Sequence, residues 1–149
     1  MKITYKGDYA LKAILDLSLL YRKDERGLVT INEIAERIDA PIKFLEQVLL
    51  ELKKGGFVVS KRGKVGGYLL AKPPARITVG EVVRYIEGPI EPISCVKEGY
   101  VGCGDVYKCA FKSIWQDVFK ATSNIIDNVT FEDLASRIEK QQSELVYSI

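Results

Sequence analysis

Three cysteines are the residues of this chain with the clearest capacity for chemistry. They are Cys95, Cys103 and Cys109, separated by seven and five residues, and the chain contains no histidine. Structural zinc sites use four nitrogen or sulfur ligands, often in closely spaced pairs, so this set matches zinc poorly. Three thiolates in a glycine-rich loop suit an iron-sulfur cluster whose remaining ligand is a different donor. Spacing alone also leaves reactive thiols and incidental cysteines open.

Other constellations that carry out catalysis are missing from the sequence. It has no histidine, no Gly-x-Ser-x-Gly motif and no phosphate-binding loop. Hydrolases and phosphoryl-transfer enzymes depend on such acids, bases and nucleophiles. We therefore expect that this protein is not an enzyme.

Basic residues gather in one part of the chain. Residues 43–76 hold eight Lys or Arg and two Glu, a net charge of +6, although the whole chain carries only +2. A local cluster of cations is what neutralisation of nucleic-acid phosphates requires. A solvated basic face is the alternative explanation.

Length and hydropathy set the class of protein. A chain of 149 residues is long enough to bury a core without disulfides. No stretch approaches the roughly 20 apolar residues of a membrane span, and the first residues lack the apolar core of a signal peptide. We expect a cytoplasmic protein without a membrane partner.

The basic segment lies in a predicted helix-turn-helix. Apolar residues at three- and four-residue steps predict a first helix from residue 9 to about 21, preceded by a short strand at residues 2–5 and capped by Asp8. Thr30 and Glu33 have capping-box spacing and begin a short second helix. Pro41 suits the first turn of a third helix, whose core stripe runs from Phe44 to Leu52. The third helix would be the recognition helix.

A β-hairpin wing is predicted directly after the third helix. Residues 57–59 and 68–70 are β-prone, and the cationic loop between them contains Gly63, Gly66 and Gly67. An α-helix fills the major groove of DNA, while a glycine-rich basic loop can approach the phosphates and the minor groove. This pair predicts binding to double-stranded DNA.

The second half of the chain combines the cysteine loop with further helices. Thr78 and Glu81 form a second capping box for a helix to about residue 87, and residues 88–108 lack periodicity. A long helix over residues 110–128 carries a broad apolar stripe from Ile114 to Val129, and Thr130 caps a last helix to about residue 141. The stripe requires a cover, either within the chain or from a second subunit.

Several motifs together resemble the Rrf2 family of bacterial transcription regulators, which includes IscR, NsrR and CymR. They are Met1 to Thr4, Gly7 to Ala10, Phe44 to Gln47, Arg62 to Leu70 and Thr78 to Val83. The resemblance covers nearly the whole chain. It implies a mainly α fold with a small β-hairpin, namely a winged helix-turn-helix at residues 1–76, followed by the cysteine sensor loop and the dimerisation helices at residues 77–149. It further implies a homodimer that binds a palindromic operator, as a repressor.

The resemblance and the groove chemistry together give candidate DNA contacts. Glu46 can accept from cytosine and Gln47 can pair with adenine, whereas Lys43 and Lys54 can reach phosphates or guanine. Phe44 matches a tyrosine that contacts DNA in IscR-like members, and core packing is its alternative role. Arg62 matches the arginine that members insert into the minor groove. The set is completed by Lys64, Gly66 and Gly67.

The resemblance also implies a cluster, [2Fe-2S] or [4Fe-4S], held by Cys95, Cys103 and Cys109. Two positions depart from cluster-binding members: the first gap is commonly five residues there, and Lys112 stands where IscR-like proteins have a histidine ligand. A lysine ammonium is stabilised beside thiolates, so Lys112 is rejected as a ligand. Asp8 of the partner subunit matches the aspartate ligand of NsrR-like sensors, with Glu98 and Asp105 as alternatives. A cluster-free, CymR-like regulator of sulfur metabolism, acting through a protein partner or thiol oxidation, is the competing interpretation.

Overall fold

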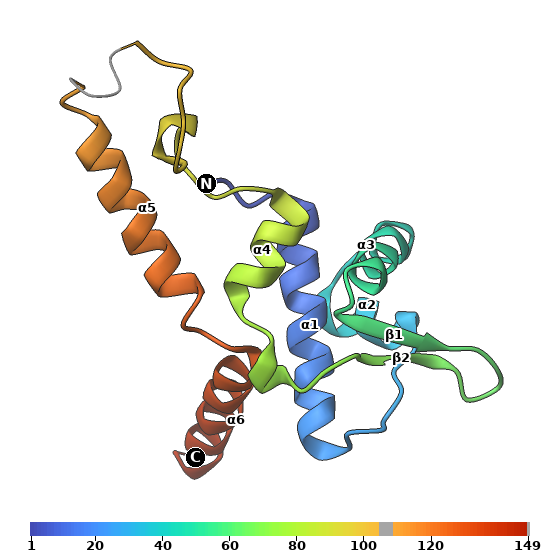
Figure 1. The fold of residues 1–149 in the computed structure, drawn as a ribbon. Helices are drawn as coiled ribbons and strands as arrows, with labels where there is room; N and C mark the ends of the chain where they lie inside the picture. The colour runs from blue at the N-terminus through green and yellow to red at the C-terminus, as the bar shows by residue number, and fades with distance from the viewer. Residues whose placement is uncertain (105–108, 149) are drawn as a thin grey trace.

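The computed structural model describes residues 1–104 and 109–148, which fold into a mainly helical structure with one two-stranded antiparallel hairpin (Figure 1). The elements are α1 (Tyr5–Lys23), α2 (Ile31–Ile38), α3 (Ile42–Lys54), β1 (Val58–Lys61), β2 (Gly67–Leu70), α4 (Val79–Glu87), α5 (Lys112–Ile126) and α6 (Phe131–Tyr147), with 3-10 turns η1 (Pro74–Arg76) and η2 (Ser94–Val96). None of the described helices is both long and apolar enough to cross a membrane.

Threonine side chains fix the starts of three helices as the sequence predicted. Each hydroxyl accepts a hydrogen bond from the backbone N–H three residues later, and the backbone N–H of the threonine donates to the acidic side chain of that later residue. These reciprocal caps satisfy backbone donors that a helix leaves open at its start. The pairs are Thr30 with Glu33, Thr78 with Glu81, and Thr130 with Asp133.

The start of α1 differs from the prediction. Residues 1–4 form no strand, and the N-cap is Thr4, whose hydroxyl accepts from the N–H of Gly7 at 3.3 Å, so the assignment of the cap to Asp8 was wrong. The carboxylate of Glu87, at the end of α4, accepts from both the N–H and the hydroxyl of Thr4 at 2.8 and 2.7 Å. With Thr4 as the N-cap, α1 starts at Tyr5, earlier in the chain than the predicted start at residue 9.

We call α1 to α4, the hairpin and α6 the head. Its centre is α1, against which α2, α3, α4 and α6 pack. The core side chains are almost fully buried, and they come from every one of these helices: Ala10, Ile14, Ile34, Leu45, Leu49, Leu52, Val82 and Phe131. The apolar stripes of these short helices are therefore stable because they are shared. The core extends across residue 76, where the boundary between two domains was predicted, and that division stays a prediction.

The wing is tied to the body of the head by backbone hydrogen bonds. β1 and β2 pair from Val58 with Leu70 to Lys61 with Gly67. Val29, before α2, adds a bridge to Tyr68, with N···O distances of 3.0 and 2.7 Å. The hairpin thus has a fixed root, which matters because an isolated two-stranded hairpin is only marginally stable.

We call the described residues 88–104 and 109–127, which include the C-cap Asp127 of α5, the arm. α5 extends away from the head, and the cysteine loop starts at the end of α4 and leads toward the far end of α5 (Figure 1). No residue of α5 is buried. α5 is slightly shorter than the predicted span of residues 110–128. By contrast, α6 continues to Tyr147, past the predicted end at about residue 141. The arm and the wing project from different sides of the head.

Candidate DNA-binding surface and cysteine loop

The two faces of α3 divide as the apolar pattern predicted. Leu45, Val48, Leu49 and Leu52 are fully buried against the head. The opposite face presents the exposed candidate contacts Lys43, Glu46, Gln47 and Lys54, together with Leu50. A helix that is anchored on one face and polar on the other can lie in a major groove with its hydrogen-bonding groups toward base edges.

Phe44 occupies a mixed position. Its ring is half-buried and meets Tyr9 of α1 edge to face, with centroids 5.5 Å apart. Such a pair contributes packing energy beyond simple burial. The geometry supports core packing as one role of Phe44, and its contact with DNA stays a prediction.

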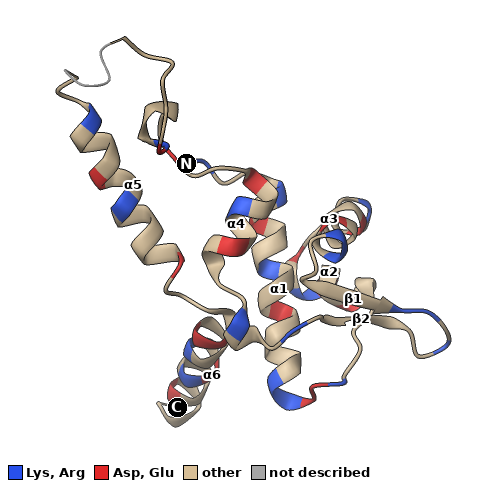
Figure 2. Ribbon diagram, viewed as in Figure 1, with Lys and Arg blue, Asp and Glu red and all other residues tan. Residues whose placement is uncertain are grey.

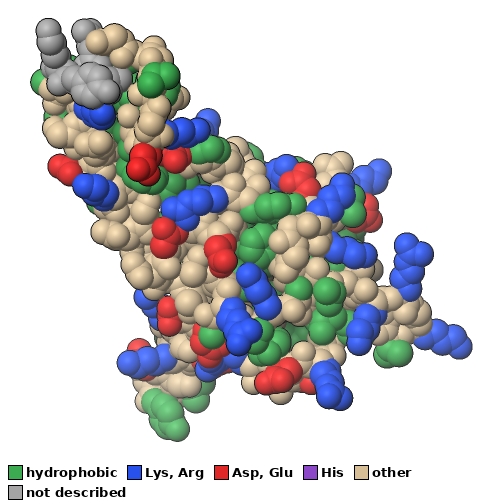
Figure 3. Space-filling view, in the orientation of Figure 1, with side chains coloured by type: hydrophobic (Ala, Val, Ile, Leu, Met, Phe, Trp, Pro, Cys, Tyr) green, Lys and Arg blue, Asp and Glu red, His purple; other side chains and the backbone are tan. Residues whose placement is uncertain are grey.

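The wing presents its cations without internal partners. Arg62 and Lys64 are exposed, and within residues 1–104 and 109–148 neither forms an ion pair. Lys53 of α3 donates to the hydroxyl of Ser60 in β1 at 2.7 Å, which joins the helix to the wing. Lys and Arg follow the wing and both ends of α3 (Figures 2 and 3). Unpaired cations on one convex surface are available for phosphate oxygens.

Two wing glycines have a reason within the chain itself. A Cβ at Gly66 would lie 2.5 Å from the carbonyl oxygen of Lys61, and one at Gly67 would lie 2.6 Å from that of Val29. These are backbone atoms that have little room to move. Gly66 and Gly67 are therefore required for closing the hairpin, apart from any approach to DNA.

The three cysteines line one cavity of about 520 Å³ in the arm. Cys95 lies in η2 and is half-buried, while Cys103 and Cys109 are exposed, and all three are free thiols. The remaining walls are apolar or aromatic: Ile93, Tyr100, Phe111 and Trp115. Soft thiolate donors in an apolar surrounding fit an iron-sulfur cluster chemically.

The cysteine loop does not hold its donors in a finished coordination geometry. Among the described residues, no three Cys, Asp or Glu side chains are close enough to share a metal ion. Glu98 lines a neighbouring cavity with Cys95 and Lys112, and Asp105 lies outside the described residues. The loop thus brings the thiols to one cavity, and they would have to converge further to bind a cluster.

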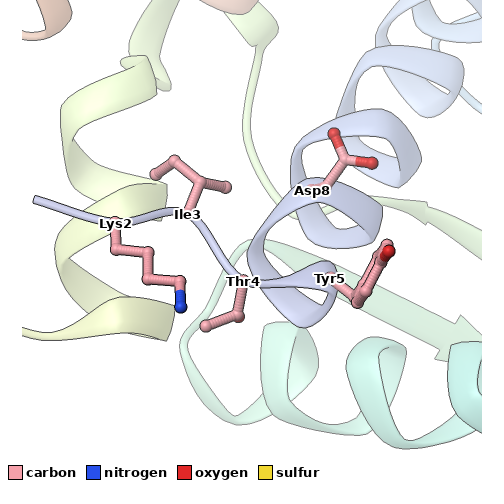
Figure 4. A pocket seen from close by; sticks show the side chains of 5 residues that line it. All are labelled: Lys2, Ile3, Thr4, Tyr5 and Asp8. Atoms are coloured by element: carbon pink, nitrogen blue, oxygen red, sulfur yellow. The ribbon is translucent and has the colours of Figure 1, made fainter.

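Asp8 does not line the cavity of the three cysteines. It is in the first turn of α1, its carboxylate pairs with the Nζ of Lys12 at 2.7 Å, and this hydrogen bond raises the pKa of Lys12. Asp8 lines an open pocket of about 530 Å³ with Lys2, Ile3, Thr4 and Tyr5 (Figure 4). Exposed apolar side chains border this pocket, including Tyr5 and Ile3.

Sequence reasoning missed several residues that position this surface. Val29 anchors the wing, Glu87 caps α1, and Tyr85 of α4 donates to the carbonyl oxygen of Glu51 at 2.9 Å. These contacts join residues far apart in the chain, so no periodic pattern reports them. For Tyr85 alone the sequence contained a signal, namely Gly55, because a glycine at the end of α3 permits close approach of a neighbouring ring.

The chain is similar to known transcriptional regulators over most of its length. The Rrf2 family profile, described as an iron-dependent transcriptional regulator, matches residues 3–137. An Rrf2-like HTH-type transcriptional regulator from Rhodobacter capsulatus is 42% identical over 136 residues, which cover 89% of this chain and 91% of that protein. The HTH-type transcriptional regulator IscR from Escherichia coli is 35% identical over 139 residues, covering 93% and 83%.

Solved structures show the same architecture. CymR, the global cysteine regulator of B. subtilis, superposes with a TM-score of 0.75 at 34% identity, over 92% of this chain and 98% of that chain. IscR of T. potens superposes with a TM-score of 0.75 at 32% identity, over 95% and 91%. With the winged helix-turn-helix and its basic surface in place, these matches show that the chain belongs to the Rrf2 family of DNA-binding transcriptional regulators, and its relatives are not enzymes.

Proposed function

We propose that the protein is a homodimeric transcriptional repressor that senses iron-sulfur, redox or nitric-oxide status through a cluster held by Cys95, Cys103 and Cys109. The observation that carries the proposal is the convergence of the three thiols on one apolar cavity, although the last two flank residues 105–108. The family profile, described as iron-dependent, supports the same interpretation. When bound, a cluster supplies electron exchange and an iron that small molecules can attack.

The thiolates would hold the cluster, and the fourth ligand would come from outside the cavity. Asp8 of the partner subunit is our proposed donor, and it would leave Lys12 on binding. A carboxylate oxygen is a harder donor than a thiolate, so it would leave one iron more open to exchange than a fourth cysteine would. Such a site suits a sensor.

Dimerisation is proposed through α5. The apolar side chains Ile114, Trp115, Val118 and Ile125 of α5 are all exposed, and so is Phe111 directly before the helix. Contiguous apolar surface of this kind marks association sites in soluble proteins. A two-fold pair of heads would place two copies of α3 on a palindromic operator.

Within each head, α3 would read bases and the wing would hold the backbone. Glu46 and Gln47 are the proposed base contacts, while Arg62, Lys64, Lys43 and Lys54 supply charge to phosphates or the minor groove. Phe44 would support α3 from the side of α1. The binding of DNA and the sensing of a signal would thus lie in separate parts of one chain.

The cluster proposal is tested on protein purified without oxygen. We expect visible absorbance and bound iron in the wild type, loss of both in a Cys95→Ala, Cys103→Ala, Cys109→Ala variant, and changed operator affinity in that variant. Ser94→Ala, beside Cys95 in η2, is the matched control and should keep the iron. Colourless, iron-free wild type after reconstitution in vitro, with unchanged DNA binding in the triple variant, would contradict the proposal.

The second candidate is a cluster-free regulator of cysteine or sulfur metabolism. The match to CymR, named the global cysteine regulator of B. subtilis, supports it, with the same TM-score of 0.75 as the match to IscR of T. potens. In this case the thiols would respond by oxidation, or a protein partner would bind the arm. Metal analysis separates the two candidates, because only the first requires iron.

A further inference from the structure

Three side chains near the end of α4 contact three different elements. Successive helical residues point about 100° apart, so Arg84, Tyr85 and Glu87 face different directions. Arg84 binds Asp127 after α5, Tyr85 binds the end of α3, and Glu87 binds the start of α1. α4 is therefore the element through which the arm meets both the core helix and the recognition helix.

The contact of Tyr85 with α3 is closely fitted. Its hydroxyl donates to the carbonyl oxygen of Glu51 at 2.9 Å, the same oxygen that accepts the N–H of Gly55 at 2.9 Å. A Cβ at Gly55 would lie 2.7 Å from the Tyr85 ring, and the ring meets Phe57 edge to face, with centroids 5.5 Å apart. Tyr85 thus holds the point where α3 ends and the wing begins.

The contact of Arg84 with the arm is equally specific. Its guanidinium binds both carboxylate oxygens of Asp127, one of them at 3.0 Å, and this hydrogen bonding raises the pKa of Arg84. A Cβ at Gly80 would collide with the Asp127 carboxylate, so the glycine makes room for the pair. Glu91, at the beginning of the cysteine loop, adds a further negative charge that acts on Arg84.

Glu87 completes the arrangement on the other side. It binds Thr4 in the segment before α1, and Gly88 follows at once with a φ of 88°, where the cysteine loop begins. A displacement of that loop therefore acts directly on the last turn of α4. Because the last turn also carries Tyr85, the end of α3 would move with it.

We propose that α4 couples the cysteine loop to the recognition helix, and that the hydroxyl of Tyr85 is the positioning contact that transmits the state of the loop to α3 and the wing. The inference rests on the proposed sensing function. Tyr85 touches no DNA in this scheme; it acts by fixing the C-terminal end of α3. Its removal should therefore weaken the response to the loop while leaving the fold intact.

The experiment compares operator affinity in two states of the loop. A duplex is first selected from random DNA with wild-type protein, and Kd is then measured at one salt concentration for iron-loaded and for metal-stripped protein. The larger Kd divided by the smaller Kd measures the coupling, for which about 5- to 150-fold is usual. Tyr85→Phe removes one oxygen atom and should lower the ratio by about 2- to 30-fold, with unchanged Tm. Tyr147→Phe, at a residue 90% exposed on α6, is the matched control and should keep the ratio.

Each other outcome overturns a defined claim. A wild-type ratio of one would contradict the sensing function, and the coupling with it. A ratio above one that Tyr85→Phe preserves would contradict the coupling alone, as would equal weakening of both states, which indicates a purely structural role. Hydrogen exchange gives a second reading: the N–H of Gly55 should exchange at different rates in the two wild-type states, and identical rates would refute the coupling.

Discussion

The head and the arm differ in how much of their apolar surface one chain can cover. In the head, core side chains from five helices are buried to within a few per cent of their surface. In the arm, α5 has an apolar stripe of similar strength, yet none of its residues is buried. Similar apolar patterns in the sequence therefore correspond to buried side chains in the head and to exposed side chains in the arm. The head covers its own apolar core, while the arm has exposed apolar surface that is consistent with a second subunit.

The largest expected effect is on the core of the head. Leu49→Ala removes a fully buried side chain of α3 and should lower the free energy of unfolding by about 2–5 kcal/mol, since it leaves a cavity among Leu45, Leu52 and their neighbours. Leu50→Ala on the same helix removes a side chain that is 52% exposed and should change stability by less than about 1 kcal/mol. Chemical denaturation measures both. Equal losses would mean that the head is not packed as described.

The next effect tests the arm. Val118→Glu with Ile125→Glu places charges on the exposed apolar stripe of α5, so self-association should weaken by at least about tenfold, roughly 1.4 kcal/mol. The unfolding of the head should hardly change, because neither side chain touches its core. Sedimentation measures association, and Lys120→Glu, an exposed residue of the same helix, is the control. Unchanged association would remove α5 from the proposed interface.

A third prediction divides the DNA surface of the head into reading and holding parts. Gln47→Ala should cost about 1–3 kcal/mol at one base pair of the operator, because a base edge loses its partner. Arg62→Ala and Lys64→Ala should weaken binding to all sequences and each reduce the salt slope by about one. Binding to selected and random duplexes over a range of salt measures both. The same loss on both kinds of DNA for all three variants would refute the assignment of Gln47.

The smallest effect concerns acid stability of the head. Hydrogen bonds from the backbone N–H and hydroxyl of Thr30 lower the pKa of Glu33, and those of Thr130 lower the pKa of Asp133. A carboxyl with a lowered pKa in the folded state stabilises it above its unfolded pKa, and that contribution is lost as the pH falls through the folded pKa. Glu33→Gln keeps an acceptor but removes the titration, so the fall of Tm below about pH 4 should become shallower. Thermal unfolding followed over a range of pH measures the effect, and an acid dependence identical to that of the wild type would contradict the contribution of this cap.

The sequence predicted the elements of the head well, because each carried a local signal. Three threonine caps, the apolar stripe of α3 and the glycine-bearing hairpin were all found where the residues indicated. The start of α1 was misplaced, since Asp8 has the chemistry of a cap but Thr4 receives the partner from a distant helix. Gly66 and Gly67 were assigned to DNA approach, and the packing adds an internal reason for both.

Residue types and their spacing by themselves determined the fold class, the basic surface and the set of three thiols, because helix periodicity, caps and charge are properties of neighbouring residues. Only the tertiary structure decided that the thiols share a cavity, that the apolar stripe of α5 lies open, and that Tyr85 closes over Gly55. These facts depend on how residues far apart in the chain are brought together. Such contacts are set by the packing of whole elements against one another, and no local pattern encodes them.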